Sequence, residues 1–234
     1  MRTAAILPVK RFAEAKQRLG ASVADSLRLE LARAMVGDVL AALAETASVD
    51  LTIVVTGEPT VAATARAQGA IVIDDTAQAG QSAAVALGVE RALTEEVERV
   101  LCIPGDCPTL DPAELVALLG PSTDGGPEVV IVPDRHGTGT NGLLLAPPDT
   151  IPLSFGPNSC ERHRALAVAA EVPWRIERPA SLLLDIDTGE DLTVLRTRLV
   201  GDRTSGEHRV RAPRTRALLD RTAGGDRPAV TIPA

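Results

Sequence analysis

Short runs of apolar, largely β-branched residues alternate with segments of helical periodicity through the first half of the chain. This alternation restricts the possible folds more than any other feature of the sequence. Four runs are typical of buried strands: Thr3–Val9, Leu51–Val55, Ala70–Ile73 and Val100–Pro104. Strands that alternate with helices predict a mainly parallel sheet, joined by right-handed crossovers and flanked by helices. We therefore expect an α/β fold.

The intervening segments have apolar residues at the spacing of amphipathic helices. The second of these helices is rich in Ala and runs through Ala67, and the third spans Ser82–Leu93. In the fourth, Asp111 and Pro112 are typical of the cap and first turn of a helix that continues over Ala113–Leu119. The first helix is marked by Leu27, Leu31, Ala34, Met35 and Leu40.

The second half of the chain is less regular and ends in a segment of different composition. Residues 201–234 contain seven Arg against four acidic residues, with several Gly and Pro and little apolar periodicity. We expect residues 1–200 to form one domain and residues 201–234 to be an Arg-rich, mobile tail, in which Arg214–Arg221 could form a short helix. Before the tail, the sequence predicts strands at Glu128–Pro133, Gly142–Ala146 and Leu182–Ile186 and a helix at Glu190–Val200.

Charge and aromatic content exclude several classes of function. The formal net charge is −7, and because the tail has an excess of three positive charges, the rest of the chain carries −10. A protein held mainly by nucleic-acid phosphates or anionic lipid would carry the opposite sign. The aromatic residues are Phe12, Phe155 and Trp174, too few for a base-stacking surface. Nucleic acid and membrane are therefore not expected partners.

The sequence also bears on localisation. No apolar run reaches the ~20 residues of a membrane span, and Lys10 interrupts the opening apolar stretch too early for a secretory signal. Cys102, Cys107 and Cys160 are odd in number and form no CxxC pair, which fits neither a disulfide framework nor a zinc site. We expect a cytoplasmic protein with reduced cysteines.

A cluster of cations follows the first predicted strand. Lys10 and Lys16 are the only lysines in the chain, against 22 arginines, and Arg11 and Arg18 lie in the same segment. Open α/β sheets bind ligands at the carboxyl ends of their strands. The natural occupant of such a site is a polyphosphate, and the alternative is a solvated basic loop.

Carboxylates follow two other predicted strands. Asp106 comes directly after Gly105 at the end of a buried run, and Asp185 and Asp187 end another. In an extended segment, residues two apart point to the same side. Magnesium ions are held by one or two carboxylates together with substrate phosphates. We therefore predict a Mg²⁺ site, with helix capping as the alternative role of Asp187.

Two polar segments could bind an anion. Asp134–Asn141 offers hydroxyls and backbone N–H groups that could form a nest. Phe155–Ser159 precedes a predicted helix start with the cations Arg162 and Arg164, which suits a phosphate or carboxylate. A plain capped turn is the alternative for the second segment. Neither a Ser-His-Asp nor a Cys-His arrangement can be argued from the sequence, and His136 and His163 lack metal-binding spacing.

Taken together and in this order, the motifs resemble the CofC/FbiD family of guanylyltransferases from deazaflavin coenzyme F-420 biosynthesis. The resemblance covers about residues 4–199. Its motifs are Pro8–Lys10 with Lys16–Leu19, Gly105–Pro108, Asp134–Arg135 with Gly137–Thr140, Phe155–Ser159 with Arg162–Arg164, and Asp185–Thr188.

The resemblance implies a single-domain nucleotidyltransferase of glycosyltransferase-A-like, Rossmann-like fold over residues 1–200. Such an enzyme joins GMP from GTP to the phosphate of a small phospho-acid and releases pyrophosphate. The expected acceptor is phosphoenolpyruvate, with 2-phospho-L-lactate next and 3-phospho-D-glycerate also used in the family. The implied catalytic residues are Lys10, Lys16, Arg18 and Asp106, the implied phospho-acid ligands are Thr140, Gly156, Ser159 and Arg162, and the implied Mg²⁺ ligands are Asp106 with one or both of Asp185 and Asp187.

The resemblance leaves open the nucleotide contact, the protein partner, the oligomeric state and the alternative functions. Ser82 stands where the family pattern has an Asn that contacts the nucleotide. The implied partners are GTP and a phospho-acid, with the downstream enzyme that takes up the labile product as a candidate protein partner, and the chain could be a monomer or a homodimer. Alternative functions are nucleotidyl transfer to molybdopterin or a sugar phosphate, and GTP binding without catalysis.

Overall fold

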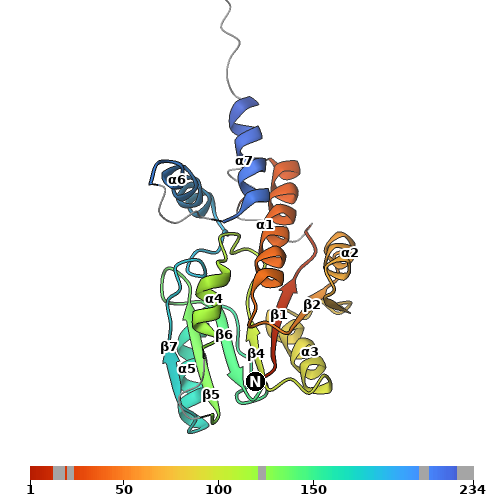
Figure 1. Ribbon diagram of the computed structural model, residues 1–234, viewed down its shortest axis with the longest axis vertical. Helices are drawn as coiled ribbons and strands as arrows, with labels where there is room; N and C mark the ends of the chain where they lie inside the picture. Colours follow the sequence, from red (N-terminus) through yellow and green to blue (C-terminus); the bar gives the residue numbers. More distant parts are fainter. Residues whose placement is uncertain (13–18, 20–23, 121–124, 206–210, 226–234) are drawn as a thin grey trace, which may run out of the picture.

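A computed structural model describes residues 1–12, 19, 24–120, 125–205 and 211–225. Within these ranges, one sheet of seven strands has the order β3-β2-β1-β4-β6-β5-β7 (Figure 1). Strand β6 is antiparallel to both of its neighbours, and all other neighbouring pairs are parallel. The strands are β1 (Thr3–Val9), β2 (Leu51–Thr56), β3 (Ile71–Asp74), β4 (Arg99–Cys102), β5 (Glu128–Pro133), β6 (Thr140–Ala146) and β7 (Trp174–Ile176).

Helices cover both faces of the sheet, which confirms the predicted α/β fold with a mainly parallel sheet (Figure 1). Helices α1, α2 and α4 pack on one face, and α3 and α5 pack on the other. Among the described helices, none is long and apolar enough to cross a membrane. The helices are α1 (Asp25–Glu45), α2 (Pro59–Ala67), α3 (Gln81–Thr94), α4 (Pro112–Leu118), α5 (Ser159–Ala169), α6 (Gly189–Ser205) and α7 (Pro213–Gly225).

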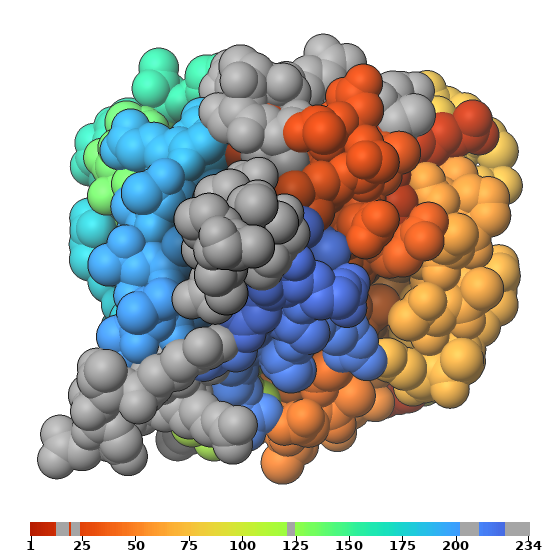
Figure 2. Space-filling view, turned by 90° about the horizontal axis from the view of Figure 1, so that it is seen from above, coloured from red at the N-terminus to blue at the C-terminus, as the bar shows by residue number. Residues whose placement is uncertain are grey.

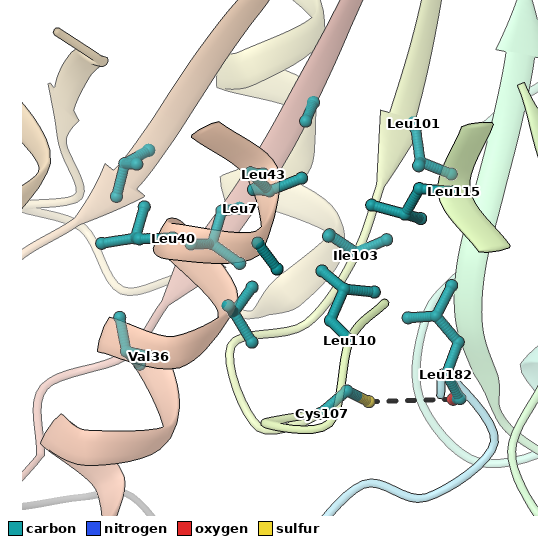
Figure 3. Packing of buried hydrophobic residues seen from close by; sticks show 14 of the residues in the cluster. Leu7, Val36, Leu40, Leu43, Leu101, Ile103, Cys107, Leu110, Leu115 and Leu182 are labelled. Carbon is teal, nitrogen blue, oxygen red and sulfur yellow. Dashed lines mark hydrogen bonds between the residues drawn. The ribbon is translucent and has the colours of Figure 1, made fainter. Parts of the chain in front are cut away.

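The central strands are mainly apolar because their side chains meet a helix layer on either face of the sheet. In β1, Ala5 and Leu7 face the layer of α1, α2 and α4, whereas Ala4 and Ile6 face α3 and α5. Figure 3 shows Leu7 among the side chains of α1 and α4 in the first of these layers. In the same view, the thiol of Cys107 donates a weak hydrogen bond to the backbone carbonyl of Leu182 (3.7 Å). That bond ties the turn after β4 to the segment that carries Asp185.

The predicted strand at Leu182–Ile186 is wrong. The segment has the expected alternation, with Leu182, Leu184 and Ile186 buried, but it joins no strand of the sheet. Instead, the Ile186 N–H donates to the backbone carbonyl of Asp106 (3.1 Å). The edge position beside β5 is taken by β7, which the sequence analysis did not predict because three residues are too few to show a periodic pattern.

Residues 211–222 differ from the predicted mobile tail. Helix α7 lies between α1 and α6 (Figures 1 and 2) and buries Leu218 and Leu219 in a third apolar cluster with both helices. The predicted short helix Arg214–Arg221 lies within it. The buried carboxylate of Asp38, in the middle of α1, accepts hydrogen bonds from the backbone N–H groups of Arg214 (3.0 Å) and Thr215 (2.9 Å). An acidic group at a helix N-terminus stabilises it.

We expect Asp38→Ala to lower the free energy of unfolding by about 1–3 kcal/mol, because it leaves two N–H groups of α7 without their acceptors. Urea unfolding measures the change. Glu45→Ala is the matched control, since Glu45 lies on the same helix and pairs with Arg211 at the exposed surface. That pair should contribute less than about 1 kcal/mol. Equal losses in both variants would contradict a capping role for Asp38.

Candidate active site

A cleft of about 570 Å³ opens at the carboxyl ends of β1 and β4. From β1 the chain adds β2 and then β3 on one side of β1, and later places β4 on the other side. The cleft therefore lies at the point where the strand order reverses. Ligands of open α/β sheets bind at such points. The end of β1, the buried face of α1, the start of α3 and the turn after β4 form its walls. The cleft is therefore the candidate active site.

Lys10 lies at the mouth of the cleft, directly after β1, and is exposed. The segment is held on its far side by Phe12, whose ring is buried and also lines the cleft. The Phe12 N–H donates to the carboxylate of Glu58 (3.2 Å), and its carbonyl accepts from Arg28 (3.4 Å). Lys10 therefore lies at the cleft between two fixed parts of the chain, the end of β1 and Phe12. The other two implied catalytic cations, Lys16 and Arg18, lie outside the described residues.

The three predicted carboxylates come together on the opposite wall. Asp106 and Asp187 line the cleft, and Asp185 lies behind them. The amide of Asn141 donates to Asp185 Oδ1 (3.1 Å) and to the Leu182 carbonyl (2.9 Å), which fixes the position of the Asp185 carboxylate. The sequence analysis included Asn141 as the last residue of the predicted anion-binding segment but did not identify it as a partner of Asp185.

The electrostatics of this wall favour a bound cation. Burial raises the pKa of Asp185 to about 6, and the negative charges of Asp106 and Asp187 add to the rise. Within the part of the chain that the structure describes, no three His, Cys, Asp or Glu side chains are grouped closely enough to hold a metal ion by themselves. Magnesium characteristically completes its shell with water and substrate phosphates. The carboxylates therefore fit an ion bound together with a polyphosphate.

The Asp187 segment is fixed by a reciprocal helix cap. The Asp191 carboxylate accepts hydrogen bonds from the backbone N–H groups of Asp187 (3.1 Å) and Thr188 (2.7 Å) and pairs with Arg135 (2.8 Å). The Asp191 N–H in turn donates to the Thr188 hydroxyl (3.3 Å). Thr188 and Asp191 therefore cap α6, and the alternative of Asp187 as the cap is wrong. The Thr-x-x-Asp spacing of a capping box could have identified this from the sequence.

The predicted anion nest in Asp134–Asn141 is occupied by the chain itself. The Asp134 carboxylate accepts from the N–H groups of His136 (3.1 Å) and Thr138 (2.8 Å). Burial would raise the pKa of Asp134, but its hydrogen bonds with Thr138 and Gly139 outweigh this effect and hold the pKa below its usual value. The loop is therefore a self-contained turn that leads into β6 at Thr140. The expectation that these N–H groups are open to an external anion is wrong for His136 and Thr138.

The four predicted phospho-acid ligands lie close together beside the cleft. Gly156 has φ of 109°, a conformation that favours glycine, and Ser159 is buried at the first position of α5. The Arg162 guanidinium donates to Ser154 Oγ (2.8 Å) and to the carbonyls of Ser154 (2.8 Å) and Phe155 (3.1 Å), and also to that of Pro157. Arg162 therefore shapes the loop of residues 154–157, here called the substrate loop, from behind.

The substrate loop adjoins the cleft without lining it. The Phe155 N–H donates to the Ser82 hydroxyl (2.9 Å), which attaches the loop to the first turn of α3. Phe155 borders a small hollow that shares Pro8, Gln81 and Pro104 with the cleft. Ser82 thus has a structural contact at the position where the family pattern suggested an Asn.

His163 is a further site residue, to which the sequence analysis assigned no role. It is fully buried under the substrate loop, where Nε2 accepts from the Ser154 N–H (3.0 Å) and Nδ1 lies 3.1 Å from the Thr140 hydroxyl. Burial, together with the charge of Arg162, lowers its pKa to about 4. His163 is therefore neutral at physiological pH and connects Thr140 to the substrate loop.

Known proteins resemble the chain in both sequence and structure. A phosphoenolpyruvate guanylyltransferase of Conexibacter woesei is 49% identical over 220 residues, which are 94% of this chain and 96% of that protein. One of Sphaerobacter thermophilus is 36% identical and covers 83% of this chain and 93% of its own length. The crystal structure of a putative nucleotide-diphospho-sugar transferase from Desulfovibrio desulfuricans has a TM-score of 0.72 at 19% identity, covering 96% of each chain.

The fold thus agrees with that of the solved structure. The family model for guanylyl transferases of the CofC-like type matches residues 3–214, which is most of the chain and includes the first residues of α7. That match, with a relative at 49% identity over nearly the whole length, confirms the resemblance found in the motifs. The chain is a nucleotidyltransferase that belongs to the family of CofC-like guanylyl transferases.

Proposed function

We propose that the chain transfers GMP from GTP to the phosphate of phosphoenolpyruvate and releases pyrophosphate. The observation that carries this proposal is the meeting of Lys10 with Asp106 and Asp187 around one cleft at the switch point of the sheet. Relatives named phosphoenolpyruvate guanylyltransferase support the acceptor. The same resemblance supports a place in deazaflavin coenzyme F-420 biosynthesis.

The reaction needs no catalytic base because the acceptor's phosphate oxygen is already an anionic nucleophile. That oxygen attacks the α-phosphorus of GTP, a new P–O bond forms, and the bond to the β-phosphate oxygen breaks as pyrophosphate leaves. The protein has to hold the oxygen in line with the α-phosphorus and to offset the charge of the leaving group. Lys10 is assigned to the phosphates, and Thr140, Gly156 and Ser159 are assigned to the phospho-acid.

Asp106 and Asp187 are the residues assigned to Mg²⁺, with Asp185 in support from behind. The ion would neutralise charge on the phosphates of GTP, which a bare cluster of carboxylates would repel. The Asp191 cap and the Asn141 amide keep two of these carboxylates in position before the nucleotide binds. Pre-organised ligands reduce the ordering that binding would otherwise require.

The test is pyrophosphate release from GTP and Mg²⁺ with phosphoenolpyruvate, 2-phospho-L-lactate and 3-phospho-D-glycerate supplied separately. We expect the highest kcat/KM with phosphoenolpyruvate, and phosphorus NMR of that reaction should show a new phosphoanhydride. CTP and UTP in place of GTP test the nucleotide. Release with another acid only would overturn phosphoenolpyruvate as the acceptor. Binding of GTP without release from any acid would overturn the proposed reaction.

A further inference from the structure

The hydrogen bonds of His163 determine which of its ring nitrogens carries the proton. A backbone N–H can only donate, so the bond from Ser154 requires an unprotonated Nε2. In a neutral imidazole the proton must then be on Nδ1, the nitrogen that faces the Thr140 hydroxyl. The ring is held in this orientation by an edge-on contact with Phe155 (4.9 Å between centroids, 71° between planes).

The tautomer in turn fixes the polarity of the Thr140 hydroxyl. The hydroxyl oxygen of Thr140 accepts a hydrogen bond from the Nδ1–H group, which occupies one of its lone pairs. The hydrogen of the hydroxyl therefore points in another direction. Thr140 is the first residue of β6 and lies at the edge of the sheet where β4 and β5 end, beside the substrate loop. A hydroxyl held in this way is a hydrogen-bond donor toward that side, which is what an anionic ligand requires.

We propose that His163 is a positioning residue that sets Thr140 as a donor to the phospho-acid and couples it to the shape of the substrate loop. The inference rests on the proposed function, because it takes the phospho-acid as the ligand of Thr140. The low pKa of His163 is consistent with this arrangement, since an imidazolium could not accept from Ser154. Arg162 contacts the same loop through Ser154 Oγ and three carbonyls, so the loop is fixed from two sides.

The tautomer can be tested without any activity. The chain contains three histidines, and long-range ¹⁵N–¹H correlation of the histidine-labelled full-length protein distinguishes protonated from unprotonated ring nitrogens. The signals of His163 are those missing in the His163→Asn variant. At pH 7 we expect Nδ1 protonated and Nε2 unprotonated. A proton on Nε2, or on both nitrogens, would overturn the inference even in a fully active enzyme.

Two variants separate the two hydrogen bonds of His163. In His163→Asn the amide nitrogen takes a position near Nδ1 and can still donate to Thr140. In His163→Gln the amide oxygen reaches the position of Nε2, so this variant keeps the hydrogen bond from Ser154 and loses the one to Thr140. We expect His163→Gln to raise KM for phosphoenolpyruvate about tenfold, the effect of one lost hydrogen bond. KM for GTP should change less than about twofold. His163→Asn should raise KM for phosphoenolpyruvate less than His163→Gln does.

The double variant Thr140→Val, His163→Gln tests whether His163 acts through Thr140. If it does, the second substitution adds no further increase in KM to that of Thr140→Val alone, because coupled residues are not additive. Additive increases would overturn the coupling, and a parallel rise of both KM values would indicate a purely structural role. If none of the three acids is an acceptor, both the proposed function and the assignment of Thr140 to the phospho-acid are overturned. The tautomer of His163 is tested independently by NMR.

Discussion

Asp106→Asn should reduce guanylyl transfer by about a thousandfold, the scale of losing a charged group that acts on the transition state of phosphoryl transfer. Asn keeps the size of the side chain and one oxygen, but it removes the charge that faces the cleft beside Asp187. Single-turnover pyrophosphate release, measured at saturating GTP and Mg²⁺, gives the loss. Excess EDTA should likewise abolish the wild-type reaction, and added Mg²⁺ should restore it.

Asp111→Asn is the matched control for this variant. Asp111 lies five residues further on and caps α4 through a hydrogen bond to the Ala113 N–H (2.9 Å). Asn is an equally good N-cap, so both stability and activity should stay close to wild type. A folded Asp106→Asn enzyme that keeps more than about a tenth of wild-type activity would contradict the role of Asp106, as would full activity in EDTA.

Gly88→Ala should lower the free energy of unfolding by about 2–3 kcal/mol, a large part of the stability of a typical domain. A Cβ at Gly88 would lie 2.5 Å from the Cγ2 atom of Ile6, and Ile6 belongs to the central strand β1 and is fully buried. Helix α3 would have to move away from the sheet. Because the first turn of α3 borders the cleft and holds the substrate loop through Ser82, GTP binding should weaken as well.

Gly201→Ala provides the control for Gly88→Ala. Gly201 is also helical, in α6, and a Cβ there would meet no atom within 4 Å. Without a steric clash, Ala is favoured over Gly in a helix by up to about 1 kcal/mol. Urea unfolding should therefore show opposite signs for the two variants. A Gly88→Ala protein as stable as wild type would show that the close approach of α3 to β1 is not required.

The sequence predicted the parts of the fold that depend on local patterns. Strands β1, β2 and β4 are mainly apolar because most of their side chains are buried on both faces of the sheet, and short apolar runs of this kind can be recognised in the sequence alone. The positions of Lys10 and Asp106 directly after two strands also followed from local information, because each follows an apolar run. These expectations needed no knowledge of which distant segments pair.

The features that were missed depend on partners far apart in the chain. Leu182–Ile186 has the alternation of a strand, but its backbone bonds to the turn at Asp106 instead of to a sheet neighbour. A short helix at Arg214–Arg221 was predicted, but its packing was missed because the leucines of α7 become significant only once α1 and α6 lie beside them. His163 had no recognisable motif, since its role comes from two contacts, with Thr140 and Ser154, that only the folded chain creates.

The reversed direction of β6 has a consequence for how such enzymes diverge. Because β6 starts where β4 and β5 end, the turn between β5 and β6 opens at the same edge of the sheet as the cleft. The proposed function assigns the acceptor to this turn and the substrate loop, and the nucleotide to the end of β1, α1 and the start of α3. The turn between β5 and β6 and the substrate loop both lie outside the hydrogen-bonded ladder of the sheet. The proposed function therefore allows acceptor preference to change through these two loops while the nucleotide half stays the same.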